Sequence, residues 1–121
     1  MRHKILIADD DISMLNLLET ILKNKGYDVT AVSDGEEAVL KAKSQLPSLI
    51  MLDIHMPKKN GIEALKEIKS DSLLKQIPVI MLTVEGAPSE IQMAMLYGAA
   101  TYITKPAKKD DILKILENYL I

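Results

Sequence analysis

Residues 5–24 read ILIADDDISMLNLLETILKN. This stretch combines a predicted strand with a predicted helix, and the chain repeats this strand–helix unit. The apolar run over residues 4–8 is typical of a strand buried on both faces of a sheet. Apolar residues at helical spacing then predict a helix over residues 12–24, and Gly26 is a stop signal. Between the two stand three aspartates, which repel one another unless a cation binds them or they reach solvent.

The same alternation of strand and helix continues to the end of the chain. We expect further strands over residues 27–32, 48–52, 78–82 and 99–103. We expect further helices from Asp34 to about residue 45 and over residues 62–69, 88–97 and 109–120. Near-continuous apolar strands that alternate with helices predict an α/β fold, a parallel sheet with helices on both faces. No linker interrupts the pattern, so we expect one domain over residues 1–121.

Composition excludes several classes of function. The chain has 121 residues, no cysteine and a net charge of −2, so thiolate metal sites, disulfides and a cysteine nucleophile are excluded. The lysines are scattered without a basic stripe, and we expect no direct contact with nucleic acid. No apolar run approaches the length of a membrane span, and the acidic N-terminal segment does not resemble a signal peptide. We therefore expect a cytoplasmic domain with no membrane association.

Polar side chains follow four of the predicted strands. They are Asp9, Asp10 and Asp11 after the first strand, Asp53 after the third, Thr83 after the fourth and Lys105 after the fifth. In parallel α/β sheets, ligands bind at the carboxyl ends of the strands, so we expect these groups to converge on one rim. Carboxylate oxygens suit Mg²⁺, and a carboxylate close to bound Mg²⁺ can accept a phosphoryl group. A lysine ammonium and a threonine hydroxyl can hold the transferred oxygens.

The segments IADDD (7–11), LDIHMPKKNG (52–61), LTVE (82–85) and ITKP (103–106), taken in this order and spacing, resemble the receiver domain of two-component response regulators. The resemblance covers essentially the whole chain. It implies a doubly wound, flavodoxin-like (βα)5 domain with strand order 2-1-3-4-5. It also implies that Asp53 is the phospho-acceptor, and that Mg²⁺ is held by Asp10, Asp53 and the backbone carbonyl of His55, with Asp9 acting largely through water.

The resemblance assigns further roles at the same rim. Thr83 matches the hydroxyl that moves towards the phosphoryl group, and Lys105 the lysine that pairs with it. Tyr102 matches the switch aromatic, expected to turn inward on activation, and the bond before Pro106 is expected to be cis. The implied phosphoryl donor is a phosphohistidine on a histidine kinase or a phosphotransfer protein. Receipt of the phosphoryl group would switch a protein-binding face, and the domain would be a monomer or a weak dimer that catalyses only its own phosphorylation and dephosphorylation.

Several residues have simpler structural interpretations. Asp11 and Asp34 are well placed to cap the helices that follow them. Gly61 is expected at a turn that needs positive φ or a close backbone approach. We interpret Met93 and Met95 as helix packing rather than as a binding surface.

Two positions depart from the family pattern, and two others tend to tune phosphoryl lifetime in the family. Val84 stands where the family commonly has a small residue, and it is expected to narrow access to the phosphoryl group. Ala107 stands where phenylalanine is common, which removes a packing anchor for the final helix. His55 and Glu85 hold two positions that tend to tune phosphoryl lifetime.

Two other functions fit parts of the sequence. A pseudo-receiver would keep the fold as an interaction module without being phosphorylated, although none of the acidic, hydroxyl and lysine groups is missing here. A Mg²⁺-dependent phosphohydrolase of the haloacid dehalogenase type would use Asp9, Asp11 and Ser13 as a strand-end motif. That assignment leaves Asp53 unexplained, and the chain is short for that fold. The cognate kinase and the output stay open, as does the choice between a stand-alone regulator and part of a longer protein.

Overall fold

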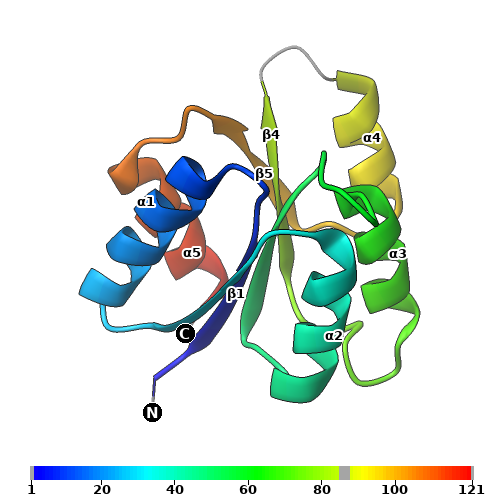
Figure 1. Cartoon of the computed structure of the whole chain (residues 1–121), viewed down its shortest axis with the longest axis horizontal. Coiled ribbons are helices and arrows are strands. Elements are labelled where there is room, and N and C mark those ends of the chain that lie inside the picture. Colours follow the sequence, from blue (N-terminus) through cyan, green and yellow to red (C-terminus); the bar gives the residue numbers. More distant parts are fainter. Residues whose placement is uncertain (1, 85–87, 121) are drawn as a thin grey trace.

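The computed structural model of the chain describes residues 2–84 and 88–120, in which strands and helices alternate (Figure 1). The strands are β1 (Lys4–Ala8), β2 (Asp28–Val32), β3 (Leu49–Asp53), β4 (Val79–Val84) and β5 (Thr101–Lys105). The helices are α1 (Ile12–Asn24), α2 (Gly35–Gln45), α3 (Gly61–Ser70), α4 (Pro88–Leu96) and α5 (Lys109–Tyr119).

All five strands are parallel, in the order β2-β1-β3-β4-β5, as expected. Helices α1 and α5 cover one face of the sheet, and α2, α3 and α4 cover the other (Figure 1). Alternate residues of one strand serve both layers, since Ile5 and Ile7 pack towards α1 and α5 while Leu6 and Ala8 pack towards α2 and α3. The sheet is therefore buried on both faces, which explains why its central strands are apolar throughout.

The last strand begins later than expected. We predicted it over residues 99–103, whereas β5 starts at Thr101 and ends at Lys105. Gly98, with φ of 103°, lets the chain leave α4, and the backbone N–H groups of Ala99 and Ala100 bond back to Ala94 and across to Val79. Strand β4 likewise extends to Val84. Thr83 and Lys105 therefore lie within the strand ends rather than beyond them.

The packing interpretation of Met93 and Met95 is wrong. Only Ala94 of α4 is buried, and the two methionine side chains are exposed together with Leu96. The helix is apolar around most of its circumference, yet only one narrow side of it contacts the sheet. Helix α4 thus presents an apolar outer face to solvent.

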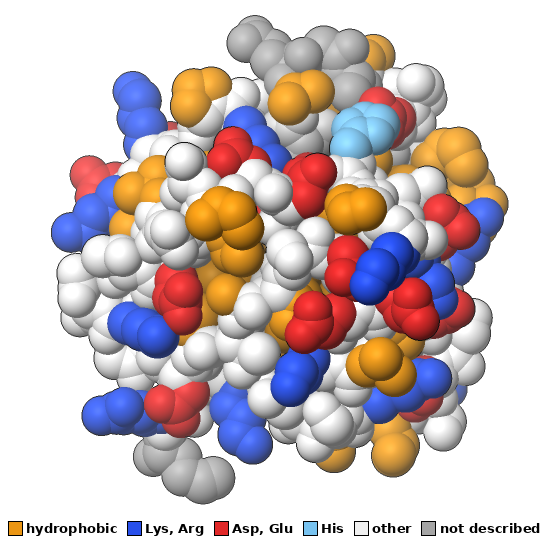
Figure 2. All heavy atoms as spheres, viewed as in Figure 1, with side chains coloured by type: hydrophobic (Ala, Val, Ile, Leu, Met, Phe, Trp, Pro, Cys, Tyr) orange, Lys and Arg blue, Asp and Glu red, His pale blue; other side chains and the backbone are white. Residues whose placement is uncertain are grey.

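The rest of the surface is mixed. On the face shown in Figure 2, charged side chains of both signs are interspersed with single hydrophobic side chains. None of the helices formed by the described residues combines the length and apolar character that crossing a bilayer requires.

Candidate functional site

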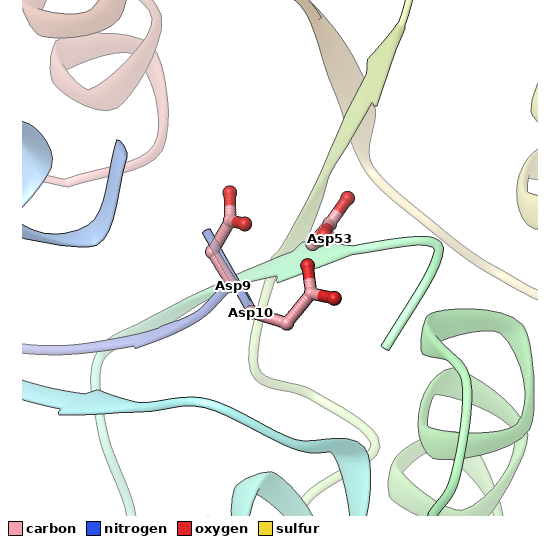
Figure 3. A group of neighbouring side chains, drawn as sticks. All are labelled: Asp9, Asp10 and Asp53. Atoms are coloured by element: carbon pink, nitrogen blue, oxygen red, sulfur yellow. The ribbon is translucent and has the colours of Figure 1, made fainter. Parts of the chain in front are cut away.

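The candidate site lies at the carboxyl ends of the central strands. Asp9 and Asp10 follow β1, and Asp53 is the last residue of the neighbouring strand β3 (Figure 3). Each of the three aspartates offers a carboxylate oxygen, and these three oxygens lie within 4.8 Å of one another. Asp9 and Asp53 are buried, whereas Asp10 is exposed. The sheet topology thus brings Asp53 beside Asp9, although the two residues are 44 positions apart in the sequence.

Lys105 reaches this cluster from the end of β5. Its ammonium nitrogen lies 2.8 Å from Oδ2 of Asp9 and 3.2 Å from Oδ1 of Asp53. The lysine side chain is only 18% exposed, so the two ion pairs are shielded from water. One cation therefore bridges two buried carboxylates.

Burial and charge shift the ionisation of this group of residues. Burial, together with the nearby charge of Asp9, raises the pKa of Asp53 from 3.8 to about 6, against the opposing pull of Lys105. Burial alone would lower the pKa of Lys105, but its contacts with Asp9 and Asp53 outweigh burial and raise the pKa. The site therefore has more negative charge than its own lysine neutralises.

The three consecutive aspartates have three different environments. Asp11 caps α1, since its Oδ1 accepts hydrogen bonds from the backbone N–H groups of Ser13 and Met14, as predicted. Oδ1 of Asp9 accepts the backbone N–H of Asp11 at 2.9 Å, and this bond fixes the turn between β1 and α1. Asp34 caps α2 in the same way as Asp11 caps α1, through the N–H of Glu37. The run of acids is tolerated because only two of them face the cluster.

The donor set fits a hard divalent cation. Oδ2 of Asp9 is fully buried, and the Lys105 ammonium lies 2.8 Å from it. Asp10 and Asp53 add carboxylate oxygens to the same cluster. Carboxylates, backbone carbonyls and water are the ligands that Mg²⁺ prefers. A bound cation would also offset the repulsion that raises the pKa of Asp53.

The loop after Asp53 is held by a close backbone contact. A Cβ on Gly61 would lie 2.1 Å from the backbone oxygen of Asp53, and the Gly61 N–H donates to the carbonyl of Ile54 at 2.7 Å. Of the two reasons we considered for this glycine, close approach is the one that applies. The start of α3 is therefore fastened against the end of β3, which positions Asp53.

The remaining predicted residues surround the cluster. Thr83 is buried in β4, and its hydroxyl donates only a long, 3.3 Å bond to the carbonyl of Val84. Val84 is 54% exposed at the strand end and pairs in register with Lys105. Tyr102 is 42% exposed and so lies outward. The Lys105–Pro106 bond is cis, as the resemblance implied. Glu85 lies outside the described residues.

Ala107 lies beside a hollow next to α5. A hollow of about 410 Å³ lies between β5 and α5, with Tyr102, Pro106, Ala107 and Ile115 among its lining residues. Helix α5 is nevertheless fixed to the sheet by Ile112 and Leu116, both fully buried. Helix α5 is therefore docked on the sheet without an aromatic residue at position 107.

Sequence reasoning missed one contact at the edge of the site. Nε2 of His55 lies 2.8 Å and 3.1 Å from the two carboxylate oxygens of Glu90, in the first turn of α4. The two residues are 35 positions apart, and no local pattern pairs them. Only the tertiary fold brings the loop after Asp53 against the start of α4.

Comparisons with known proteins agree with this geometry. Residues 5–117 match the family model of the response regulator receiver domain. The chain is 42% identical over 106 residues to the alkaline phosphatase synthesis transcriptional regulatory protein PhoP of Bacillus subtilis, a match that covers 88% of this chain and 43% of PhoP. It is 32% identical over 113 residues to the DNA-binding response regulator MtrA of Mycobacterium tuberculosis, covering 93% of this chain and 48% of MtrA. The chain thus spans about half the length of these curated relatives.

Solved structures show the same fold. The chemotaxis response regulator CheY4 of Vibrio cholerae superposes with a TM-score of 0.93 at 33% identity, over 99% of this chain and all of CheY4. The receiver domain of the sensor histidine kinase PA1611 of Pseudomonas aeruginosa, solved with a magnesium ion in its active-site cleft, superposes with a TM-score of 0.91 at 28% identity over 98% of each chain. On its sequence match and its fold, this chain belongs to the response regulator receiver domain family, whose function is phosphorylation-based signalling.

Proposed function

We propose that this domain accepts a phosphoryl group on Asp53 and passes the change to a protein-binding face. The observation that carries the proposal is the Lys105 ammonium, which lies against both Asp9 and Asp53 at the centre of the acidic cluster. An ammonium in this place can pair with a phosphoryl oxygen once Asp53 is modified. The donor class we propose is phosphohistidine, on a histidine kinase or a phosphotransfer protein.

The transfer itself is a displacement at phosphorus. An Asp53 oxygen forms the new bond as the bond from phosphorus to the donor's imidazole nitrogen breaks, and that nitrogen leaves with the electron pair. Asp10, Asp53 and the backbone carbonyl of His55 are the residues we propose to hold Mg²⁺, with Asp9 contacting it through water. When bound, the ion offsets charge on the phosphoryl oxygens. Lys105 and the Thr83 hydroxyl hold the other oxygens.

The switch we propose begins at Thr83. Its hydroxyl now makes only a 3.3 Å bond to the next carbonyl, so little holds it back from a phosphoryl oxygen. Movement of Thr83 leaves room for Tyr102, which is now outward, to turn inward. The surface that changes comprises α4, β5 and α5, where the apolar side chains of Met93, Met95 and Leu96 are exposed. The change is a shift between two populated states.

We further propose that the domain works in the cytoplasm and catalyses only its own phosphorylation and dephosphorylation. Its direct partners are then proteins, the kinase or phosphotransfer protein and a downstream target, and the domain itself is a monomer or a weak dimer.

The test is intact-mass measurement after incubation with Mg²⁺ and acetyl phosphate. We expect a base-labile gain of one phosphoryl group in the wild type and none in Asp53→Asn, with Asp11→Asn as a matched control that keeps the gain. A gain that persists in Asp53→Asn but disappears in Asp9→Asn would instead favour a phosphohydrolase nucleophile at Asp9. No gain from either acetyl phosphate or a phosphorylated kinase would overturn the proposal in favour of a pseudo-receiver.

A further inference from the structure

The contact between His55 and Glu90 joins two parts of the molecule that the proposed switch must connect. His55 lies two residues after Asp53, and Glu90 lies in the first turn of α4. Both carboxylate oxygens of Glu90 lie within 3.1 Å of Nε2 of His55. The loop that follows the proposed phospho-acceptor is thus tied directly to the helix that exposes Met93, Met95 and Leu96.

Helix α4 has few other attachments. Ala94 is its only buried residue among those described. Just beyond its C-terminal end, Tyr97 lies under the Lys66 ammonium of α3 at 4.3 Å. Within the described residues, the bridge from Glu90 to His55 is the only polar side-chain contact that α4 makes with another part of the chain. A helix held by so few contacts is easily displaced, and its first turn depends most on the bridge.

We propose that Glu90 is a positioning residue whose bridge to His55 restrains the first turn of α4 in the unphosphorylated protein. The role of this bridge in switching rests on the proposed function, whereas its restraint of α4 is tested in the unphosphorylated protein. Any change at Asp53 that shifts the adjoining loop moves His55, and the bridge then transmits that movement to α4. By reciprocity, a partner that displaces α4 acts back on the loop beside Asp53.

The expected effect is modest because the bridge lies at the surface. The His55 side chain is largely exposed and that of Glu90 about one-third exposed, and exposed polar contacts of this kind change an equilibrium by roughly two- to fivefold. A change of that size is enough to alter the population of a displaced α4 without unfolding the domain.

The experiment is amide hydrogen exchange of the unphosphorylated protein, followed over residues 88–97. We expect Glu90→Ala to speed exchange there by about two- to fivefold, and Glu90→Gln, which can still hydrogen-bond to His55, to stay near the wild type. Glu19→Ala removes a comparable exposed pair with Lys23 on α1 and serves as the control, with no change in α4. Unchanged α4 exchange in Glu90→Ala would overturn the proposal.

A double-mutant cycle separates the bridge from a general loosening of α4. We expect His55→Ala to speed α4 exchange as Glu90→Ala does, and the double variant to add nothing further. Additive effects would show that the two residues act independently and would also overturn the proposal. Phosphoryl uptake is measured in parallel by mass. A wild type that takes up none would refute the proposed function, while the cycle on unphosphorylated protein would still decide the role of Glu90.

Discussion

Nζ of Lys105, the last residue of β5, lies 3.2 Å from Oδ1 of Asp53, the last residue of β3, across the intervening strand β4. This pair crosses the centre of the candidate site, and Lys105 directly affects the ionisation of Asp53, the proposed phospho-acceptor. Lys105 lowers the pKa of Asp53 by its charge and its hydrogen bond, yet burial and Asp9 keep that pKa at about 6.

Removing the ammonium should therefore raise the pKa of Asp53 further. In Lys105→Met the favourable charge is lost while burial and Asp9 remain, so we expect a pKa above that of the wild type. Carboxyl ¹³C chemical shifts followed against pH in metal-free protein would measure it. A pKa equal to or below the wild-type value would contradict the assigned geometry.

Ionised Asp53 should destabilise the metal-free fold. Its folded pKa of about 6 lies above the ordinary 3.8, so the folded state binds the proton more tightly, and stability is lost as pH rises from about 4 to 6. We expect Asp53→Asn to raise the free energy of unfolding at pH 7 by about 1 to 3 kcal/mol, and the advantage to vanish below about pH 4. Urea unfolding at several pH values tests this.

The control for this prediction is Asp28→Asn, which removes an exposed aspartate near the opposite ends of the strands. Its unfolding free energy should follow the wild-type pH dependence. A wild type that is no less stable at pH 7 than Asp53→Asn would refute the prediction. Saturating Mg²⁺ should narrow the difference between the two proteins, because the ion binds the ionised form.

Substitution of the neighbouring acids Asp10 and Asp11 should affect different properties of the protein. Asp10→Asn removes a charged carboxylate from the cluster. Because Mg²⁺ prefers such ligands, we expect its affinity to fall by roughly tenfold or more. Asp11→Ala removes the α1 cap, and we expect a loss of about 1 kcal/mol in stability with Mg²⁺ affinity kept. Calorimetric titration and urea unfolding measure the two effects. If Asp11→Ala lowered Mg²⁺ affinity while Asp10→Asn lowered only stability, the metal-binding and capping roles of the two residues would have to be exchanged.

Gly61 should tolerate no larger residue. A Cβ there would lie 2.1 Å from the backbone oxygen of Asp53, so Gly61→Ala must push the start of α3 away from β3. We expect a loss of about 3 kcal/mol or more, measured by urea unfolding. Gly26→Ala is the matched control: its Cβ meets nothing within 4 Å, and only its φ of 97° opposes the change, at about 1 kcal/mol. Equal losses would argue against a close contact at Gly61.

Val84 should limit small donors. Its side chain is exposed at the end of β4 beside Lys105, so Val84→Ala removes bulk from the rim without opening the core. We expect faster phosphorylation by acetyl phosphate, by about threefold or more, with stability within about 0.5 kcal/mol of the wild type. Mass measurements over time would follow the rate. An unchanged rate would show that Val84 does not obstruct access.

Sequence reasoning reached the fold because short apolar runs alternate along the chain with longer segments that have helical spacing or helix start and stop signals. The acids Asp9, Asp10 and Asp53 were also predicted together, since the ends of parallel strands meet at one rim. The helix caps Asp11 and Asp34 followed from local chemistry alone. These features depend on a few neighbouring residues, or on a rule of topology.

Tertiary structure decided the rest. The exposure of Met93 and Met95 could not be inferred, because an apolar helix is expected to be buried and only the packing shows which side meets the sheet. The late start of β5 depends on the backbone bond from Ala99 back to Ala94 and on the bond from Ala100 across to Val79 on β4. The bridge between His55 and Glu90 spans 35 residues. Apolar patterning and spacing in the sequence thus determined the elements, their order along the chain and the acidic rim, whereas contacts between distant residues became fixed only when the helices packed on the sheet.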